Sequence, residues 1–350
     1  MQPITIGNHT VGPGNPCFIV AEIGLNHNGD MDLAGQTIRA AAESGADAVK
    51  FQNYRTEDFI SNRSLTYEYI SEGKTVIEPQ YDMFKRCELS LKMLRELKAC
   101  CDDCGIVFHS TPTGEDSIRD LVEVGAPMLK NGSDYLTNLS LIRAMGESGL
   151  PTVLSTGMAN LAEVDEAVRA FRETGNEELI LLHCTSSYPT PSEDVNLRRI
   201  PVLGDAFECL SGFSDHTAGV TAAIGSVVLG ACLIEKHFTF DKKQPGPDHR
   251  FSSDPAELKE LVEAVRTIEE NLGNSRIGPT PSEALGRRDF RLSCVTRRAL
   301  PAGHTIQNDD LAFRRPGTGI PPAHAYLLAG RKLKQDVPAG KIIELEDLGD

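Results

Sequence analysis

Basic residues are scarce in this sequence: 35 Lys and Arg stand against 50 Asp and Glu, which gives a net charge of −15. Proteins that bind nucleic acid or anionic membranes usually carry excess positive charge, so the balance argues against both classes. A local basic pocket for a small anion is still compatible with it. No apolar run reaches the roughly 18 residues of a transmembrane helix, and residues 1–10 lack the basic and apolar regions of a secretory signal. We therefore expect a cytoplasmic protein.

The cysteines do not form the pattern of a disulfide framework. There are nine of them, an odd number, and most lie within apolar runs. Buried, reduced thiols are the simpler interpretation. With 350 residues, of which 40% are apolar, the chain is long enough for one large domain or two unequal ones.

A repeated pattern extends from residue 17 to about residue 270. Short apolar runs that end in polar residues occupy 17–24, 46–53, 106–112, 127–133, 151–157, 178–186, 209–217 and 231–239. Amphipathic stretches lie between or after them, at 32–44, 91–104, 115–124, 139–148, 161–174, 218–229 and 255–272. Eight apolar strands that alternate with helices predict a parallel (β/α)₈ TIM barrel. A doubly wound open sheet is the alternative, but the first run lacks the Gly-rich turn typical of that fold.

The pattern stops at Gly273 and divides the chain. We expect a catalytic barrel over residues 1–273, in which residues 1–16 form a hairpin at the bottom. Residues 274–290 are rich in Pro, Ser, Gly and Arg and indicate a linker, and residues 291–350 indicate a small, turn-rich second domain. The insert 56–90, between the second run and its helix, is long for a loop on the functional face of such a barrel and is therefore expected to serve function.

Active sites of (β/α)₈ barrels lie at the carboxyl ends of the strands. In this chain the polar residues at those ends are Glu22; Lys50 and Gln52; Ser110 and Thr111; Lys130 and Ser133; Ser155 and Thr156; Thr185 and Tyr188; Ser214 and His216; and Lys236 and His237. Lysines supply positive charge and hydroxyls supply hydrogen-bond donors, a combination that suits a phosphate together with a carboxylate. The alternative is that each residue is polar because it faces water.

Two histidines end neighbouring runs, so their rings are expected to meet. His216 and His237 with open coordination positions suit a divalent metal that acts as a Lewis acid, with Asp215 and Glu235 as orienting carboxylates. Two hydrogen-bonded histidines without a metal are the alternative. Glu22 ends an otherwise apolar strand, where burial would raise the pKa of its carboxyl group. It is the leading general acid/base candidate, and a salt bridge to a lysine is the alternative.

The amino-acid sequence around these positions resembles that of the sialic acid synthase family, which includes N-acetylneuraminate, legionaminate and pseudaminate synthases. The resemblance rests on AEIGLNHNG at 21–29, AVKFQ at 48–52, STGM at 155–158, CTSSYP at 184–189, FSDHT at 213–217, IEKHFT at 234–239 and GPDH at 246–249. RPGTG at 315–319 resembles part of the small antifreeze-like, or SAF, domain of that family. The similar motifs cover nearly the whole chain and occur in the same order.

The resemblance implies a transferase that forms a carbon–carbon bond. Such enzymes condense phosphoenolpyruvate with an N-acylated hexosamine in its open-chain aldehyde form, release phosphate, and use Mn²⁺ or Mg²⁺. N-acetylmannosamine is the acceptor expected from family frequency, and a 2,4-diacetamido-6-deoxy sugar, as in legionaminate or pseudaminate synthesis, is the alternative. Residues 77–81, IEPQY, do not match the Asn-containing sugar-contact sequence associated with neuraminate enzymes, which leaves the acceptor open.

The matching motifs also imply roles. Glu22 resembles the catalytic acid/base, and His216 and His237 resemble the metal ligands. The phosphoenolpyruvate site is implied at Lys50, Thr111, Lys130, Ser133, Ser155 and Ser214, and sugar contacts are implied at Gln52, Tyr188 and Asp248. Arg315 resembles an arginine that the small domain of one subunit inserts into the barrel of its partner, so a homodimer with exchanged C-terminal domains is expected.

Two other functions compete with this interpretation. Another phosphoenolpyruvate-dependent aldol-type synthase, of the 3-deoxy-octulosonate phosphate kind, would also be a barrel with lysines. It would need a second basic site for its phosphorylated sugar, and it would lack the C-terminal domain. A non-catalytic glycan- or ice-binding protein that acts through its last 60 or so residues would leave the eight polar strand ends unexplained.

Overall fold

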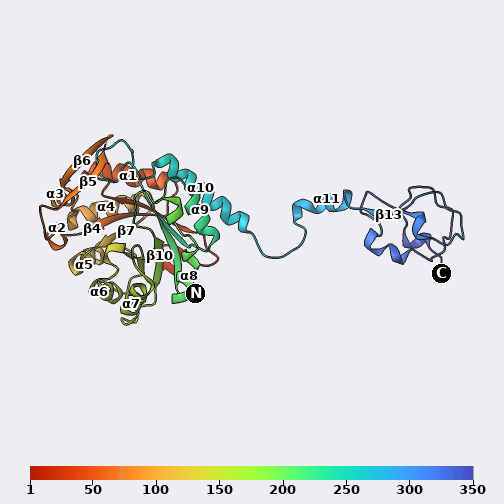
Figure 1. The fold of residues 1–350 in the computed structure, drawn as a ribbon, viewed down its shortest axis with the longest axis horizontal. Coiled ribbons are helices and arrows are strands. Elements are labelled where there is room, and N and C mark those ends of the chain that lie inside the picture. Colours follow the sequence, from red (N-terminus) through yellow and green to blue (C-terminus); the bar gives the residue numbers. More distant parts are fainter. Residues whose placement is uncertain (72, 350) are drawn as a thin grey trace. The chain divides into compact units, whose positions relative to one another are not determined.

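The computed structural model describes residues 1–71 and 73–349 (Figure 1). The chain divides into two compact units, Met1–Gly273 and Asn274–Asp350. Each unit has its own hydrophobic core, so the two are described separately. None of the helices in the described ranges has the length and hydropathy that a bilayer-spanning segment requires.

The larger unit is a closed barrel of eight parallel strands, which confirms the predicted fold. The strands are β3 (Phe18–Gly24), β4 (Ala48–Asn53), β7 (Val107–Pro112), β8 (Leu129–Asn131), β9 (Thr152–Ser155), β10 (Leu179–Cys184), β11 (Leu210–Asp215) and β12 (Leu233–His237). They pair in chain order, and β12 closes on β3. Closure excludes the doubly wound open sheet. The strands are buried along nearly their whole length because helices cover the outside of the barrel and side chains fill its inside.

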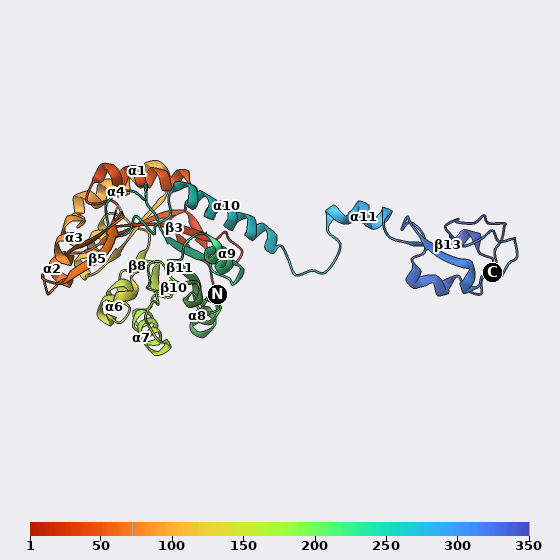
Figure 2. The same cartoon turned by 45° about the horizontal axis from the view of Figure 1, so that its top comes forward.

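Eight helices surround the strands (Figure 2): α1 (Met31–Glu43), α4 (Leu91–Cys104), α5 (Glu115–Glu123), α6 (Leu139–Glu147), α7 (Leu161–Arg172), α8 (Arg199–Phe207), α9 (Thr221–Val228) and α10 (Pro255–Leu272). Several begin at side chains that accept hydrogen bonds from the first turn, such as Asp30, Ser90 and Asp254. Helix α8 lies where no amphipathic stretch was predicted. It has nine residues and includes Pro201 and Gly204, and these residue types usually mark turns.

Both faces of the barrel carry extra elements. At the bottom, the hairpin of β1 (Ile4–Ile6) and β2 (His9–Val11) packs Ile4, Ile6 and Val11 against the first residues of the strands, as expected. At the functional face, the insert between β4 and α4 folds into α2 (Thr56–Phe59), the antiparallel strands β5 (Thr66–Ser71) and β6 (Lys74–Pro79), and α3 (Gln80–Arg86).

The smaller unit contains little regular structure. Strands β13 (Ser293–Thr296) and β14 (Leu311–Arg314) pair antiparallel, and short 3₁₀ turns lie at Asn308–Asp310, Pro322–Leu327 and Leu345–Asp347. Its core includes Cys294, Leu300, Ile306 and Leu333. The segment 274–290, expected to be a linker, contains a 3₁₀ turn at Pro281–Glu283 and helix α11 (Ala284–Asp289).

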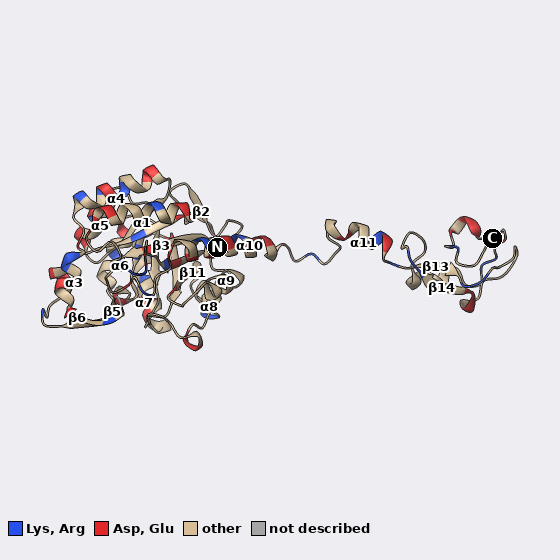
Figure 3. Cartoon of the chain, turned by 90° about the horizontal axis from the view of Figure 1, so that it is seen from above, with Lys and Arg blue, Asp and Glu red and all other residues tan. Residues whose placement is uncertain are grey.

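Exposed charges on the helices are mixed in sign. Helix α4 carries both basic and acidic residues (Figure 3), and Lys92 with Glu96 and Lys98 with Asp102 form pairs one turn apart. Such exposed pairs contribute little to stability. Their arrangement leaves this helix without the continuous basic surface that a polyanion would need.

Candidate active site

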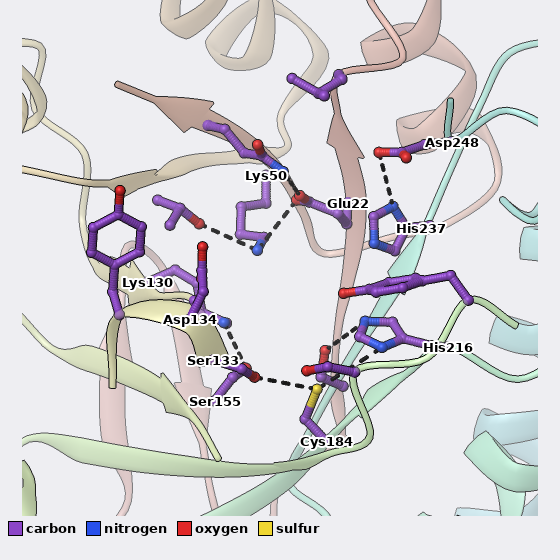
Figure 4. A pocket seen from close by; sticks show the side chains of 18 of the residues that line it. Glu22, Lys50, Lys130, Ser133, Asp134, Ser155, Cys184, His216, His237 and Asp248 are labelled. Carbon is purple, nitrogen blue, oxygen red and sulfur yellow. Dashed lines mark hydrogen bonds and ion pairs between the residues drawn. The ribbon is translucent and has the colours of Figure 1, made fainter. Parts of the chain in front are cut away.

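A cavity of about 410 Å³ opens at the carboxyl ends of the barrel strands (Figure 4). Twelve of the thirteen predicted site residues line it: Glu22, Lys50, Gln52, Thr111, Lys130, Ser133, Ser155, Tyr188, Ser214, His216, His237 and Asp248. They come from loops and strands far apart in the sequence, and closure of the barrel brings them together. The thirteenth residue, Arg315, lies in the smaller unit, where its guanidinium group is 5.1 Å from the centre of the Phe290 ring.

Alternation along the strands decides which polar residues face the cavity. On β11 and β12, Ser214 and Glu235 are paired neighbours that both point inward. The next pair, Asp215 and Lys236, lies outside the cavity lining, and the Lys236 ammonium group donates to Asp215 Oδ2 at 2.8 Å and to the Thr217 carbonyl at 2.8 Å. Lys236 is therefore half of a buried ion pair, not a residue of the expected anion site.

Four charged side chains form a row inside the barrel, with carboxylates and ammonium groups in alternation. Lys50 Nζ lies 3.4 Å from Glu22 Oε2 and 3.1 Å from Glu235 Oε1, and Lys130 Nζ lies 3.9 Å from Glu235 Oε1. All four side chains are buried. Glu22 does have the lysine neighbour that was considered as the alternative to catalysis, so its salt bridge and its position in the cavity coexist.

The row gives its two carboxylates opposite properties. Burial raises the pKa of Glu22 to about 7, with a further contribution from the negative charge of Glu235, although Lys50 opposes the shift. Burial alone would also raise the pKa of Glu235, but the positive charges of Lys130 and Lys50 outweigh burial and lower this pKa to about 2. Burial also lowers the pKa of Lys130 to about 8. Of the two carboxyl groups in the row, Glu22 is thus the one that can exchange a proton near neutral pH.

Hydroxyl groups surround the two lysines. Lys130 donates to Ser155 Oγ at 2.7 Å, and Lys50 donates to Thr111 Oγ1 at 3.3 Å. Ser133 Oγ accepts from the backbone N–H of Gly157 at 3.0 Å. Two ammonium groups and three hydroxyls at one end of a concave, largely buried site form an arrangement that can bind a small, multiply charged anion.

The two histidines meet beside this anion subsite. The ring centres of His216 and His237 are 5.5 Å apart. His216 Nδ1 lies 2.8 Å from the Thr185 carbonyl oxygen, which can only accept, so Nδ1 carries a proton, and Nε2 lies 3.4 Å from the Ser214 hydroxyl oxygen. Burial opposes ionisation of this ring, but its contact with the Cys184 thiol raises the pKa of His216. His237 Nδ1 is buried without a hydrogen-bond partner among the described residues. Burial holds the pKa of His237 well below its ordinary value, so the ring is neutral.

The two rings could hold a divalent metal, because imidazole nitrogens that carry no proton are good ligands. His237 is already neutral, and His216 would bind through Nε2 once that atom carries no proton. In residues 1–71 and 73–349, no cluster of three or more His, Cys, Asp or Glu side chains has the arrangement of a metal site. The protein would therefore supply two ligands and leave the other positions to substrate or water. Asp215 and Glu235 were expected to orient the histidines. Asp215 instead forms an ion pair with Lys236, and Glu235 forms one with Lys50. The carboxylate nearest His237 is Asp248, whose Oδ2 lies 4.0 Å from Nδ1.

The predicted sugar contacts lie around the histidines. The Tyr188 ring packs against both, with ring centres 4.1 Å from His216 and 5.6 Å from His237. Gln52 Nε2 donates to Glu22 Oε1 at 3.2 Å. Burial raises the pKa of Asp248 to about 6. A hydroxyl-rich ligand could exchange hydrogen bonds with all three side chains.

Sequence reasoning missed two parts of the cavity. One is the central position of Glu235, which the alternation in Ile234–Glu235–Lys236–His237 could have revealed, because Glu235 must face the opposite side from Lys236. The other is a group of apolar and aromatic side chains from the chain between β4 and α4, including Tyr54, Phe59 and Met83. The aromatic content of the insert is visible in the sequence, but its position over the cavity is not.

We predict that Glu235→Gln destabilises the barrel. The change leaves two buried ammonium groups without the carboxylate that lies between them, and breaking a buried ion pair in this way typically costs about 3–5 kcal/mol. Urea unfolding followed by circular dichroism should show a lower midpoint. The matched control is Glu57→Gln, the same change in the exposed pair with Lys85, which should shift the midpoint little. An equal midpoint for Glu235→Gln and the unaltered protein would contradict the role given to this carboxylate.

Comparison with known proteins identifies the family. The model of the NeuB family matches residues 37–276, and that of the SAF domain matches residues 293–349. An uncharacterised protein of Methanocaldococcus jannaschii is 43% identical and covers 99% of both chains. The N,N'-diacetyllegionaminic acid synthase of Legionella pneumophila is 40% identical and covers 96% of both chains. The N-acetylneuraminic acid synthetase of Leptospira borgpetersenii, solved with citrate, superposes with a TM-score of 0.74 at 36% identity, over 81% of this chain and 95% of that one. This chain belongs to the NeuB family and carries a C-terminal SAF domain.

Proposed function

We propose that the protein is a nonulosonate synthase that condenses phosphoenolpyruvate with an N-acylated hexosamine aldehyde and releases phosphate. The observation that carries the proposal is the cavity, in which two buried lysines and several hydroxyls adjoin a pair of histidines and a carboxyl group with a raised pKa. Phosphoenolpyruvate needs such an anion subsite. An aldehyde acceptor needs a Lewis acid beside that subsite, and a metal ion on the histidines would supply it. The family and the named synthases among its members support the same reaction class.

Phosphoenolpyruvate would lie over Lys50 and Lys130. The row of Glu22, Lys50, Glu235 and Lys130 has no net charge when all four groups are ionised, and an incoming phosphate would be a further partner of the two lysines, with Glu235 still between them. Ser155, Thr111 and Ser133 then supply donors to the remaining oxygens. Because the donors are fixed by the strands before the ligand arrives, little reorganisation is needed.

The chemistry follows from what each group can do. The enol carbon of phosphoenolpyruvate is a weak nucleophile, so the aldehyde that it attacks must be polarised. A Mn²⁺ or Mg²⁺ ion held by His216 and His237 would act as a Lewis acid for the aldehyde oxygen. Attack leaves a cationic carbon that water must trap, and ionised Glu22 would accept the proton of that water. The resulting tetrahedral centre expels phosphate, whose charge Lys50 and Lys130 stabilise.

The acceptor sugar is proposed to carry no phosphate. Among the described residues that line the cavity, Lys50 and Lys130 are the sole lysine or arginine side chains, and both are assigned to phosphoenolpyruvate. Gln52, Tyr188 and Asp248 suit hydroxyl groups, and a phosphate near Asp248 would be repelled. N-acetylmannosamine and a 2,4-diacetamido-6-deoxy sugar are the two candidates. The same absence of a second basic site argues against the synthases that use phosphorylated sugars.

We also propose that the enzyme works in the cytoplasm as a homodimer that shares its active sites. All nine cysteines are free thiols, as a reducing compartment would keep them. The dimer rests on the resemblance of Arg315, whose guanidinium group suits an amide carbonyl such as that of the N-acyl group.

The reaction itself is tested by phosphate release. Release should require phosphoenolpyruvate, a divalent metal and one of the two candidate sugars together. In ¹⁸O-water the label should enter the keto-acid product, because water traps carbon before the carbon–oxygen bond to phosphate breaks. Label in the phosphate alone would contradict this order of events, and absence of release with every N-acylated hexosamine would contradict the proposed function.

The metal assignment is tested with His216→Ala and His237→Ala. Each change removes one of two protein ligands, so Mn²⁺ affinity, measured by electron paramagnetic resonance of the free ion, should fall at least tenfold, and turnover should fall with it. Circular dichroism should stay unchanged. The control is His9→Ala, in β2 at the other end of the barrel. Retention of activity in the presence of excess chelator would show that the assignment is wrong.

Sharing of the site between subunits is tested by mixing two inactive variants. Glu22→Gln lacks the proposed base, and Arg315→Ala lacks the proposed sugar contact. If Arg315 acts in the partner's barrel, a mixed dimer contains one site with both residues intact, and the mixture should regain turnover that neither variant has alone. Lack of recovery after subunit exchange, verified by mass spectrometry of the mixed dimer, would contradict the shared site.

A further inference from the structure

The cavity has an apolar side that the proposed chemistry does not use. Leu25, Tyr54, Phe59, Met83 and Phe84 line it, and all but Leu25 lie in the chain between β4 and α4. The five side chains belong to one hydrophobic cluster outside the main barrel core. We call them the acceptor wall. The proposed catalytic groups instead lie at the strand ends, so the cavity has a polar floor and one apolar side.

The acceptor wall is rigid and offers the ligand few hydrogen-bonding groups. The rings of Tyr54, Phe59 and Phe84 pack edge to face on one another, with centres 5.0–5.6 Å apart. Tyr54 is 2% exposed, and its hydroxyl donates to the Phe84 carbonyl at 2.9 Å. The one hydroxyl of the wall is therefore already used. A rearrangement that freed it would break this hydrogen bond and the ring contacts together.

The geometry of the reaction decides which part of the sugar reaches the wall. The enol carbon and the aldehyde carbon C1 must meet at the floor, between the lysines and the histidines. The other end of an open-chain hexose, C6, is the atom farthest from that point. It must therefore lie away from the strand-end lysines and histidines, and the side chains between β4 and α4 provide cavity lining that does not belong to those strand ends.

We propose that the acceptor wall selects a sugar whose C6 is a methyl group, that is, a 6-deoxy N-acylated hexosamine. This inference rests on the proposed function and adds a determinant of specificity to it. A methyl group gains apolar contact with Leu25, Phe59 and Met83. A 6-hydroxyl loses its water at the same surface and finds no free partner there.

Two polar side chains of the insert, Gln80 and Tyr67, also line the cavity and are not part of the wall. Tyr67 is 40% exposed and stacks on Tyr69, and Gln80 begins the short helix α3. Either would give a 6-hydroxyl a partner if the sugar turned away from the wall. These two side chains could therefore bind a 6-hydroxyl group. Preference for a 6-hydroxy sugar would show that they, and not the acceptor wall, determine the acceptor.

The test compares two acceptors that differ in one oxygen atom, N-acetylmannosamine and its 6-deoxy counterpart. With saturating phosphoenolpyruvate and Mn²⁺, kcat/KM should favour the 6-deoxy sugar by roughly 10- to 100-fold, the range in which an apolar pocket rejects an added hydroxyl. Met83→Gln places an amide in the wall at nearly constant volume and should bring the ratio close to one. Met158→Gln, the same change at a cavity residue that follows β9, should leave the ratio as it is.

The outcomes separate the two proposals. Equal efficiency with both sugars, or preference for N-acetylmannosamine, overturns the role of the acceptor wall and leaves the proposed function intact. A ratio that Met83→Gln and Met158→Gln lower alike also overturns it, because the preference would then not depend on the wall. If Met83→Gln does not fold, the ratio on the unaltered enzyme decides. No phosphate release with any N-acylated hexosamine overturns the proposed function and this inference together.

Discussion

The buried row of Glu22, Lys50, Glu235 and Lys130 is the constraint on which the rest of the site depends. Four ionisable groups stay charged away from water only when each has an opposite charge beside it, and here the separations are 3.4, 3.1 and 3.9 Å. Their four strands, β3, β4, β8 and β12, can bring these groups together only in a closed barrel, because β12 must pair with β3. Closure of the fold and assembly of the site are therefore one event.

The row also explains why two glutamates in one cavity have different pKa values. Glu235 is closest to both lysines and remains ionised, so it holds their charge and position. Glu22 is paired with Lys50 alone and lies near the charge of Glu235, and its pKa rises to about 7. Similar side chains acquire different roles from their neighbours, as in other enzymes that need an acid/base and a fixed charge at once. The hydroxyls and histidines around the row then define where the proposed anion and aldehyde would lie.

Much of this could be predicted from the sequence, and the limits have physical causes. The eight apolar runs and their polar ends predicted the barrel and the residues of the cavity, because strand ends of a parallel barrel must converge. The opposite directions of Glu235 and Lys236 follow from alternation along β12, whereas the distances from Glu235 to Lys50 and Lys130 depend on how strands far apart in the sequence align. Helix α8 was missed because Pro201 and Gly204 resemble turn residues. The acceptor wall was missed because its position depends on how the insert packs, a tertiary property with no local periodicity.

The site thus combines a charged floor, which suits a reaction common to the NeuB family, with an apolar side formed by a local insert. A crystal structure of the protein with phosphoenolpyruvate and Mn²⁺ tests the central claim most directly. The account predicts the phosphate against Lys50 and Lys130, with Glu235 still between them, and the metal on His216 and His237. A phosphate bound elsewhere, or a metal that contacts neither histidine, would contradict it.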